Sequence, residues 1–100
     1  MNLTLNMIES DLYYLENKNL IKTLRMVKRL MGPSYADIKQ YCEFKTMDEV
    51  VDRLNYLYGM YAIKTVGIAE VKITHYGLLL LAIVDNEIEI KGVDKNEGKD

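Results

Sequence analysis

Apolar residues recur at helical spacing through the first third of the chain. Two stretches, 6–16 and 18–31, show this pattern, and both are predicted to be helices. In the second stretch the apolar positions form one narrow stripe: Leu20, Leu24, Val27 and Met31. We expect this stripe to face a core. Gly32 favours a left-handed helix end and Pro33 cannot continue a helix, so the second helix is predicted to stop there.

Two capping signatures predict the starts of the next two helices. Ser34 stands three residues before Asp37 and begins a short helix over about 35–43. The apolar side of this short helix has three members: Ile38, Tyr41 and Cys42. Thr46 and Glu49 repeat the signature and begin a helix over 46–58, which Gly59 ends. Its inward stripe is formed by Val50, Leu54 and Leu57.

From residue 61 the apolar period changes to two, which is typical of β-strands. The alternation over 61–66 and again over 70–74 predicts a β-hairpin with Gly67 in its turn. This interpretation requires Ile63 and Ile73 to lie on paired strands. Thr74 is predicted to cap a last helix through residue 84, which is apolar on every side over 78–84. A monomer this small rarely covers such a helix, so its pattern favours a dimer.

Beyond Asp85 the pattern is ambiguous. Residues 87–91 alternate like a strand but are equally consistent with an extension of the last helix. The polar, glycine-containing segment 92–100 is predicted to be a disordered tail. We therefore expect one domain over residues 1–91.

Composition narrows the classes of protein that fit. The chain has 100 residues, 49% of them apolar, which is enough for one core. Its 13 basic and 15 acidic residues give a net charge of -2, so binding to nucleic acid would need a local basic patch. A single cysteine, no signal-like start and a longest apolar run of 78–84 predict a soluble, cytoplasmic protein with no membrane partner.

Two segments resemble winged helix-turn-helix proteins, and the resemblance spans about residues 18–84. Residues 50–61 are similar to the end of a recognition helix that turns into the first strand of the wing. Residues 71–80 are similar to the strand, threonine, glycine and leucine-rich helix that close the wing in small prokaryotic and archaeal regulators. The resemblance implies an α+β, mainly α fold: a three-helix core, a β-hairpin wing, and extra N-terminal and C-terminal helices.

The same resemblance implies a homodimeric, sequence-specific DNA-binding protein that regulates transcription. Lys45 and Thr46 match the start of the recognition helix, and Lys64 and Lys72 match phosphate contacts of the wing. With Arg53 and Tyr56 of the 46–58 helix, these residues form the predicted DNA-binding set. The predicted dimer interface comes from both terminal helices: Tyr13, Tyr14, Tyr76, Leu79, Leu80 and Ile83. Three further tyrosines are expected in the core with their hydroxyls at its rim: Tyr41, Tyr58 and Tyr61.

The outward face of the 46–58 helix departs from that pattern because it carries acids at Asp48, Glu49 and Asp52. Acids beside a duplex weaken binding to its phosphates. This face therefore supports an alternative function, a winged-helix protein-interaction module that does not bind DNA. The strongest basic patch lies elsewhere, on the outward face of the 18–31 helix: Lys18, Lys22, Arg25 and Arg29, with Lys28 beside them. It is consistent with a solvated helix face, a phosphate-binding surface or a dock for an acidic partner.

No motif predicts catalysis, a metal site or a bound cofactor. His75 is the only histidine, and with Cys42 it lacks the spacing of a metal-ligand set. Neither residue has a neighbouring base and orienting group in the sequence that would make a nucleophilic site. We expect Cys42 to be a small apolar residue and His75 to belong to the first turn of the last helix. The sequence leaves open a disulfide between Cys42 residues of two subunits.

Overall fold

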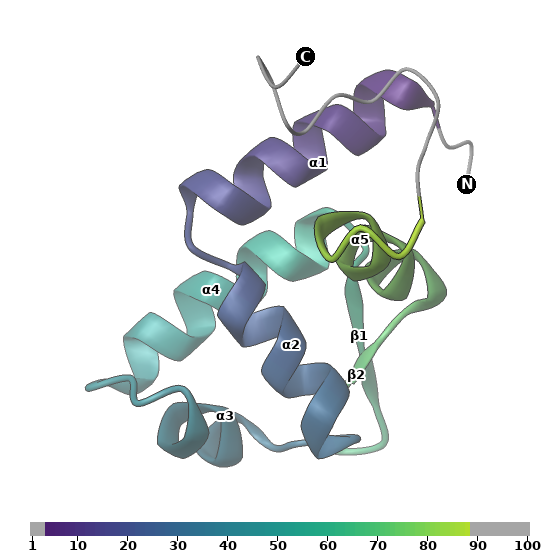
Figure 1. Cartoon of the computed structure of the whole chain (residues 1–100). Coiled ribbons are helices and arrows are strands. Elements are labelled where there is room, and N and C mark those ends of the chain that lie inside the picture. The colour runs from purple at the N-terminus through teal and green to yellow at the C-terminus, as the bar shows by residue number, and fades with distance from the viewer. Residues whose placement is uncertain (1–3, 89–100) are drawn as a thin grey trace.

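The computed structural model describes residues 4–88, which form five helices and one two-stranded antiparallel sheet (Figure 1). In chain order the elements are α1 (Leu5–Asn17), α2 (Ile21–Leu30), α3 (Tyr35–Tyr41), α4 (Met47–Gly59), β1 (Ile63–Val66), β2 (Glu70–Ile73) and α5 (His75–Val84). The α+β class, the dominance of helix and the order of elements are confirmed. The predicted tail over 92–100 and most of the ambiguous segment 87–91 lie outside the described residues.

Local hydrogen bonds at the helix starts explain why the sequence locates them well. Both predicted capping boxes form: Ser34 with Asp37 begins α3, and Thr46 with Glu49 begins α4. The Thr74 hydroxyl accepts a hydrogen bond from the Gly77 N–H at the start of α5, at 3.0 Å. Each cap joins residues three apart, so each depends only on the local sequence.

Helix α2 is shorter than the predicted 18–31 at both ends. It begins at Ile21, because Lys18 caps the end of α1 and Asn19 has a left-handed φ of 57°, so Lys18 lies outside the basic face of α2. The helix stops at Leu30, and Met31 adopts a left-handed conformation with a φ of 56°. Because the backbone turns there, the side chain leaves the apolar stripe and is 83% exposed. Leu20, Leu24 and Val27 are buried as expected, and Met31 was wrongly assigned to the core.

The hairpin pairs Ile63 with Ile73 and Lys64 with Lys72, which confirms the predicted strands. Gly67 lies in its turn with a φ of 67°. One further backbone hydrogen bond ties the sheet to the helices, because the Val71 N–H donates to the Pro33 carbonyl at 2.9 Å. The hairpin is therefore anchored beside the segment that joins α2 to α3.

Helix α5 is covered within a single chain more completely than its composition predicts. It packs against α1, α2 and β2, and Leu80, Leu81 and Ile83 are buried. Gly77 makes the close approach possible, because a Cβ there would lie 2.2 Å from the Ala62 carbonyl oxygen. Among the large apolar side chains of α5, Leu78 is the most exposed, at 37%.

Two of the three tyrosines predicted for the core are on the surface. Tyr41 ends α3 and is 51% exposed, and Tyr61 has a left-handed φ of 62° and is 64% exposed. Each stands where an element ends, so the period of the element no longer sets the direction of its side chain. Tyr58 is half-buried. None of the described helices has the length and apolar character needed to cross a membrane.

Candidate functional site

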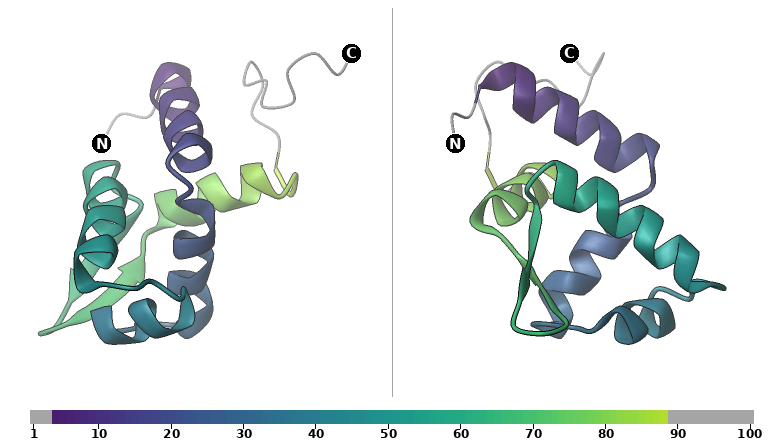
Figure 2. Two further views of the ribbon diagram at one scale, coloured as in Figure 1. Left: turned by 90° about the vertical axis from the view of Figure 1, so that its left-hand side faces the viewer. Right: turned by 180° about the vertical axis from the view of Figure 1, so that it is seen from behind.

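Helix α4 and the hairpin lie on one side of the molecule, and α2 and α5 lie on the other (Figure 2, left view). A chain of hydroxyl groups links α3, α4 and β1 on the first side. Tyr35 donates to the Tyr58 hydroxyl at 3.5 Å, and the Tyr58 and Thr65 hydroxyls are 2.5 Å apart. The contact with Tyr58 raises the pKa of Tyr35 to about 12. These contacts fix the position of the hairpin relative to α4.

The outward face of α4 is a mixture of acidic, amide and apolar side chains. Lys45 and Thr46 lie exposed at its start, and the exposed positions that follow are Met47, Asp48, Val51, Asp52 and Asn55. Met47 and Val51 are 41% and 38% exposed, respectively. Sequence reasoning did not single out these two apolar residues, although both fall outside the inward stripe of Val50, Leu54 and Leu57.

Two of the three acids on α4 are already used by the helix. The Glu49 carboxylate accepts hydrogen bonds from the backbone N–H groups of Lys45 and Thr46, at 2.7 and 3.2 Å. These bonds lower the pKa of Glu49. Asp52 accepts a hydrogen bond from Arg53 at 2.8 Å. The acidic character of this face is therefore concentrated at Asp48.

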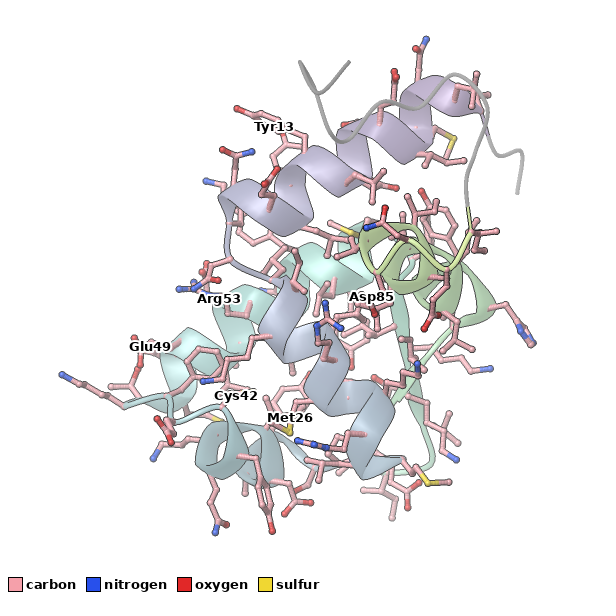
Figure 3. The ribbon with its side chains drawn as sticks, viewed as in Figure 1. Tyr13, Met26, Cys42, Glu49, Arg53 and Asp85 are labelled. Carbon is pink, nitrogen blue, oxygen red and sulfur yellow. The ribbon has the colours of Figure 1, made fainter. Side chains whose placement is uncertain are left out.

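Arg53 is engaged by its own neighbours. Its Nη1 pairs with Asp52, and its guanidinium carbon lies 5.8 Å from the centre of the Phe44 ring. Arg53 Nε is buried and has no hydrogen-bond partner among the described residues. Figure 3 shows Arg53 on the part of α4 that follows Glu49. The fold thus holds Arg53 against α4 and Phe44.

Tyr56 lies on the flank of α4 that faces α1. Its ring stacks on that of Tyr14, with centroids 6.4 Å apart and an interplanar angle of 26°. The Lys18 Nζ lies 5.4 Å from the centre of the same ring. Tyr56 is 37% exposed, so this contact leaves part of the ring open. The sequence places Tyr56 outward on its helix but carries no signal that α1 packs beside it.

Lys64 and Lys72 are brought together on the outer face of the hairpin. They stand directly opposite each other in the register and both are exposed. Like charges at opposed strand positions disfavour pairing unless another group neutralises them. Lys72 and Glu70 both lie next to Gly32 at the end of α2. The tip beyond these lysines is apolar, and Ile68 there is fully exposed.

The residues predicted for a dimer interface divide into two groups. Tyr13 and Tyr14 are 62% and 42% exposed on α1, and Tyr13 points away from the molecule (Figure 3). Tyr76, Leu80 and Ile83 are instead buried inside one chain. Leu79 is partly buried against the core. The surface that α5 offers to a second copy is therefore narrower than the sequence predicts.

The basic residues of α2 stand on a helix that lies across the molecule from α4 and packs against β2. Arg25 forms a two-armed ion pair with Asp85, with nitrogen–oxygen distances of 2.9 and 2.5 Å. Figure 3 shows Asp85 beside α2. Lys22, Lys28 and Arg29 are exposed.

Residues 4–88 contain no group of histidine, cysteine or acidic side chains that could hold a metal ion. Cys42 is buried, as predicted, and burial raises the pKa of its thiol. His75 is exposed in the first turn of α5, where the sequence places it.

The fold thus brings Lys45, Thr46, Lys64 and Lys72 to the side formed by α4 and the hairpin, while Arg53 and Tyr56 are held by neighbouring side chains. No family model, curated protein or solved structure matches this chain.

Proposed function

We propose that this chain is a winged helix-turn-helix protein that binds DNA as a homodimer and regulates transcription in the cytoplasm. In this proposal α2, α3 and α4 are the three-helix core, the hairpin is the wing, and α1 and α5 are additions. The order of elements supports it. So does the hydrogen bond from Val71 to Pro33, which gives the wing a partner between the first two core helices.

The observation that carries DNA binding is the opposed pair Lys64 and Lys72 on the same side as α4. Two ammonium groups at paired strand positions repel each other, and a phosphate near both would relieve that repulsion. Lys45 is exposed immediately before α4 and would supply a further ammonium group for a phosphate. The hairpin and the start of α4 would then hold one duplex at two points.

Base readout would fall to the middle of α4. Asn55 is a side chain type that pairs with adenine, and Val51 can contact a thymine methyl group. The two residues are four apart on the helix and both are exposed, so they present adjacent positions to a groove. Engagement of Glu49 and Asp52 within α4 reduces the repulsion that these acids would otherwise exert on a duplex.

A homodimer would use the exposed part of the predicted interface. Tyr13 and Tyr14 on α1 and Leu79 on α5 remain accessible to a second copy, whereas Tyr76, Leu80 and Ile83 stabilise the single chain from inside. Two copies related by a twofold axis would present two α4 helices to half-sites about one helical turn apart.

The test is fluorescence anisotropy with a labelled duplex of random sequence at about 50 and 200 mM salt. We expect binding that weakens steeply with salt. Lys64→Ala and Lys72→Ala should each reduce the slope of log affinity against log salt by about one. Lys39→Ala, on α3, is the matched control for loss of a lysine. Absence of binding at the lower salt concentration contradicts the proposal.

A second function is favoured by one observation, the exposed apolar residues Met47 and Val51 beside Asp48. Apolar side chains next to an unpaired acid suit a protein partner that has a basic rim around an apolar centre. Asp48→Lys distinguishes the two functions. It should tighten non-specific DNA binding, whereas a protein-interaction module should lose its partner. Glu49 is unsuitable for this test because its replacement would also remove the cap of α4.

A further inference from the structure

A hollow lies where α1 passes over the C-terminal half of α4. It has a volume of about 430 Å³ and is lined by Asp11, Tyr14, Asp52, Asn55, Tyr56, Gly59 and Met60. A second hollow of about 320 Å³ adjoins it and shares Asp11, Gly59 and Met60. Asp11 therefore stands where the two hollows meet. The larger one is within the size range of sites that bind small organic molecules.

Aromatic rings form one wall of the larger hollow. Tyr14 and Tyr56 stack with their centroids 6.4 Å apart, and each ring remains partly exposed. The Lys18 ammonium already lies 5.4 Å from the centre of the Tyr56 ring. This contact is the attraction of an ammonium group to the negative potential of an aromatic face, and a ligand cation would have to displace Lys18 from Tyr56 or approach the Tyr14 ring.

The acidic group best placed to attract a ligand is Asp11. Its carboxylate accepts a hydrogen bond from the Tyr76 hydroxyl at 2.5 Å but forms no ion pair within residues 4–88. Partial burial raises the pKa of Asp11, because the charged form loses solvent without gaining a cation. Asp52, the other acid at the hollow, is already paired with Arg53. A cation that enters the hollow would therefore meet its main counter-charge at Asp11.

The floor is apolar and open. Met60 is buried, and a Cβ added at Gly59 would have nothing within 4 Å. Gly59 lies in the last turn of α4 with an ordinary negative φ, so other residues fit its backbone. The absent side chain at this position leaves the hollow unfilled.

We infer that the hollow between α1 and α4 binds a small organic cation, an ammonium compound with an aromatic or aliphatic body. The ammonium group would lie near Asp11 and the faces of Tyr14 and Tyr56, and the body would cover Met60 and Gly59. Neutral molecules would lose the attraction to Asp11, and anions would be repelled by it. This binding does not depend on whether the chain binds DNA.

The test uses benzyltrimethylammonium as the probe in an NMR titration that follows the tyrosine rings and the Met60 methyl group. We expect saturable shifts confined to residues around the hollow. Benzyl alcohol should bind at least about tenfold more weakly and phenylacetate should not bind, because neither has the positive charge. A parallel titration with Nα-acetyl-lysine amide tests whether the hollow binds the lysine side chain of a peptide as tightly as a free ammonium compound.

Two variants locate the site, Asp11→Asn and Gly59→Leu, and each has a control variant. Asp11→Asn keeps an acceptor for Tyr76 and removes the charge, and it should weaken probe binding about tenfold. Glu9→Gln, an exposed carboxylate elsewhere on α1, is its matched control and should bind as the original chain does. Gly59→Leu should abolish saturable binding by filling the hollow, whereas Gly59→Ala should retain most of it. Melting curves of each variant establish that it is folded.

Three results would overturn the inference. The first is equal affinity for benzyltrimethylammonium and phenylacetate, which would show that charge does not select the ligand. The second is unchanged probe binding in both Asp11→Asn and Gly59→Leu. The third is an absence of saturable shifts in the folded original chain.

Discussion

The outward faces of α2 and α4 carry opposite charges, and they differ in how much of that charge the fold already uses. On α4, Glu49 serves the helix cap and Asp52 pairs with the adjacent Arg53, so most of the acidic charge is engaged locally. On α2, Arg25 is engaged by the distant Asp85, while Lys22, Lys28 and Arg29 remain exposed. A charged helix face therefore has to be judged by what remains after caps and ion pairs are accounted for.

Because two of the three acids on α4 are engaged locally, they disfavour DNA binding less than the sequence alone suggests. Read from the sequence, Asp48, Glu49 and Asp52 are equivalent negative charges. In the fold they have three different environments, and Asp48 is exposed and forms no ion pair within residues 4–88. The basic face of α2 has more exposed cations, but α2 lies across the molecule from α4. The small hairpin pair, Lys64 and Lys72, is better placed to share a duplex with α4.

Gly77→Ala should have the greatest effect, because Gly77 lies where α5 meets the segment that joins α4 to the hairpin. The new Cβ would lie 2.2 Å from the backbone oxygen of Ala62, which cannot move as a flexible side chain does. We expect the free energy of unfolding to fall by about 3 kcal/mol or more. Urea denaturation followed by circular dichroism measures this change.

Gly59→Ala is the matched control for that variant. Its Cβ would meet nothing within 4 Å, and alanine is favoured over glycine within a helix. We expect the free energy of unfolding to rise by about 0.5–1 kcal/mol. Equal effects of the two substitutions would show that the contact between α5 and Ala62 does not hold the hairpin in place.

The next largest effect sharpens the comparison of the two basic surfaces. Lys64→Glu with Lys72→Glu should weaken binding to duplex DNA by at least about tenfold at low salt, because a phosphate contact becomes a repulsion. The same double charge reversal on α2, Lys22→Glu with Arg29→Glu, should change affinity by less than about threefold, since α2 lies across the molecule from α4. Anisotropy titrations measure the DNA affinity of both double variants. A greater loss of affinity in the α2 variant than in the hairpin variant would show that DNA binds to the α2 face.

A smaller effect tests whether the acids of α4 serve the helix. Thr46→Ala removes the cap acceptor for the Glu49 N–H and should cost about 1 kcal/mol of stability. Folding lowers the pKa of Glu49 below its ordinary value of 4.5. The ionised carboxylate therefore stabilises the fold fully above pH 4.5, and this stabilisation is lost as the pH falls through the pKa of the folded protein. Thermal melts between pH 7 and the acidic range should therefore show a decline that Glu49→Gln reduces. A Glu49→Gln variant with an unchanged acid profile would contradict the assigned role.

The smallest effect concerns the ion pair that engages part of the α2 face. Arg25 and Asp85 are 48% and 28% exposed, so solvent screens their attraction and we expect a coupling of about 0.5 kcal/mol. A double-mutant cycle with Arg25→Gln and Asp85→Asn isolates this coupling from the other contacts of Asp85. The coupling should shrink further in 1 M salt, and a value that rises with salt would show that the pair is not electrostatic in origin.

The sequence predicts the elements better than it predicts their surfaces. Ser34, Thr46 and Thr74 mark helix starts because each cap bonds a group only three residues away. Met31 and Tyr61 were wrongly predicted to be buried, because both adopt left-handed backbone conformations next to the end of an element. At such a position the helical or strand period no longer determines which way the side chain points.

The candidate sites show the same limit over longer distances. Lys64 and Lys72 could be paired from the strand alternation, since a hairpin brings nearby residues into register. The stacking of Tyr14 on Tyr56 and the hydrogen bond from Tyr76 to Asp11 join residues far apart in the chain. No local period encodes such contacts, and the hollow beside Asp11 exists only because of them.

The order of helices and strands, the caps of α3, α4 and α5 and the inward stripes of the core all follow from the local sequence. These features depend on hydrogen bonds and spacings within a few residues. Only the tertiary structure decided which charges stay free, which tyrosines meet, and that one chain covers most of α5. These outcomes depend on the angles at which whole helices pack, and those angles result from contacts across the entire core.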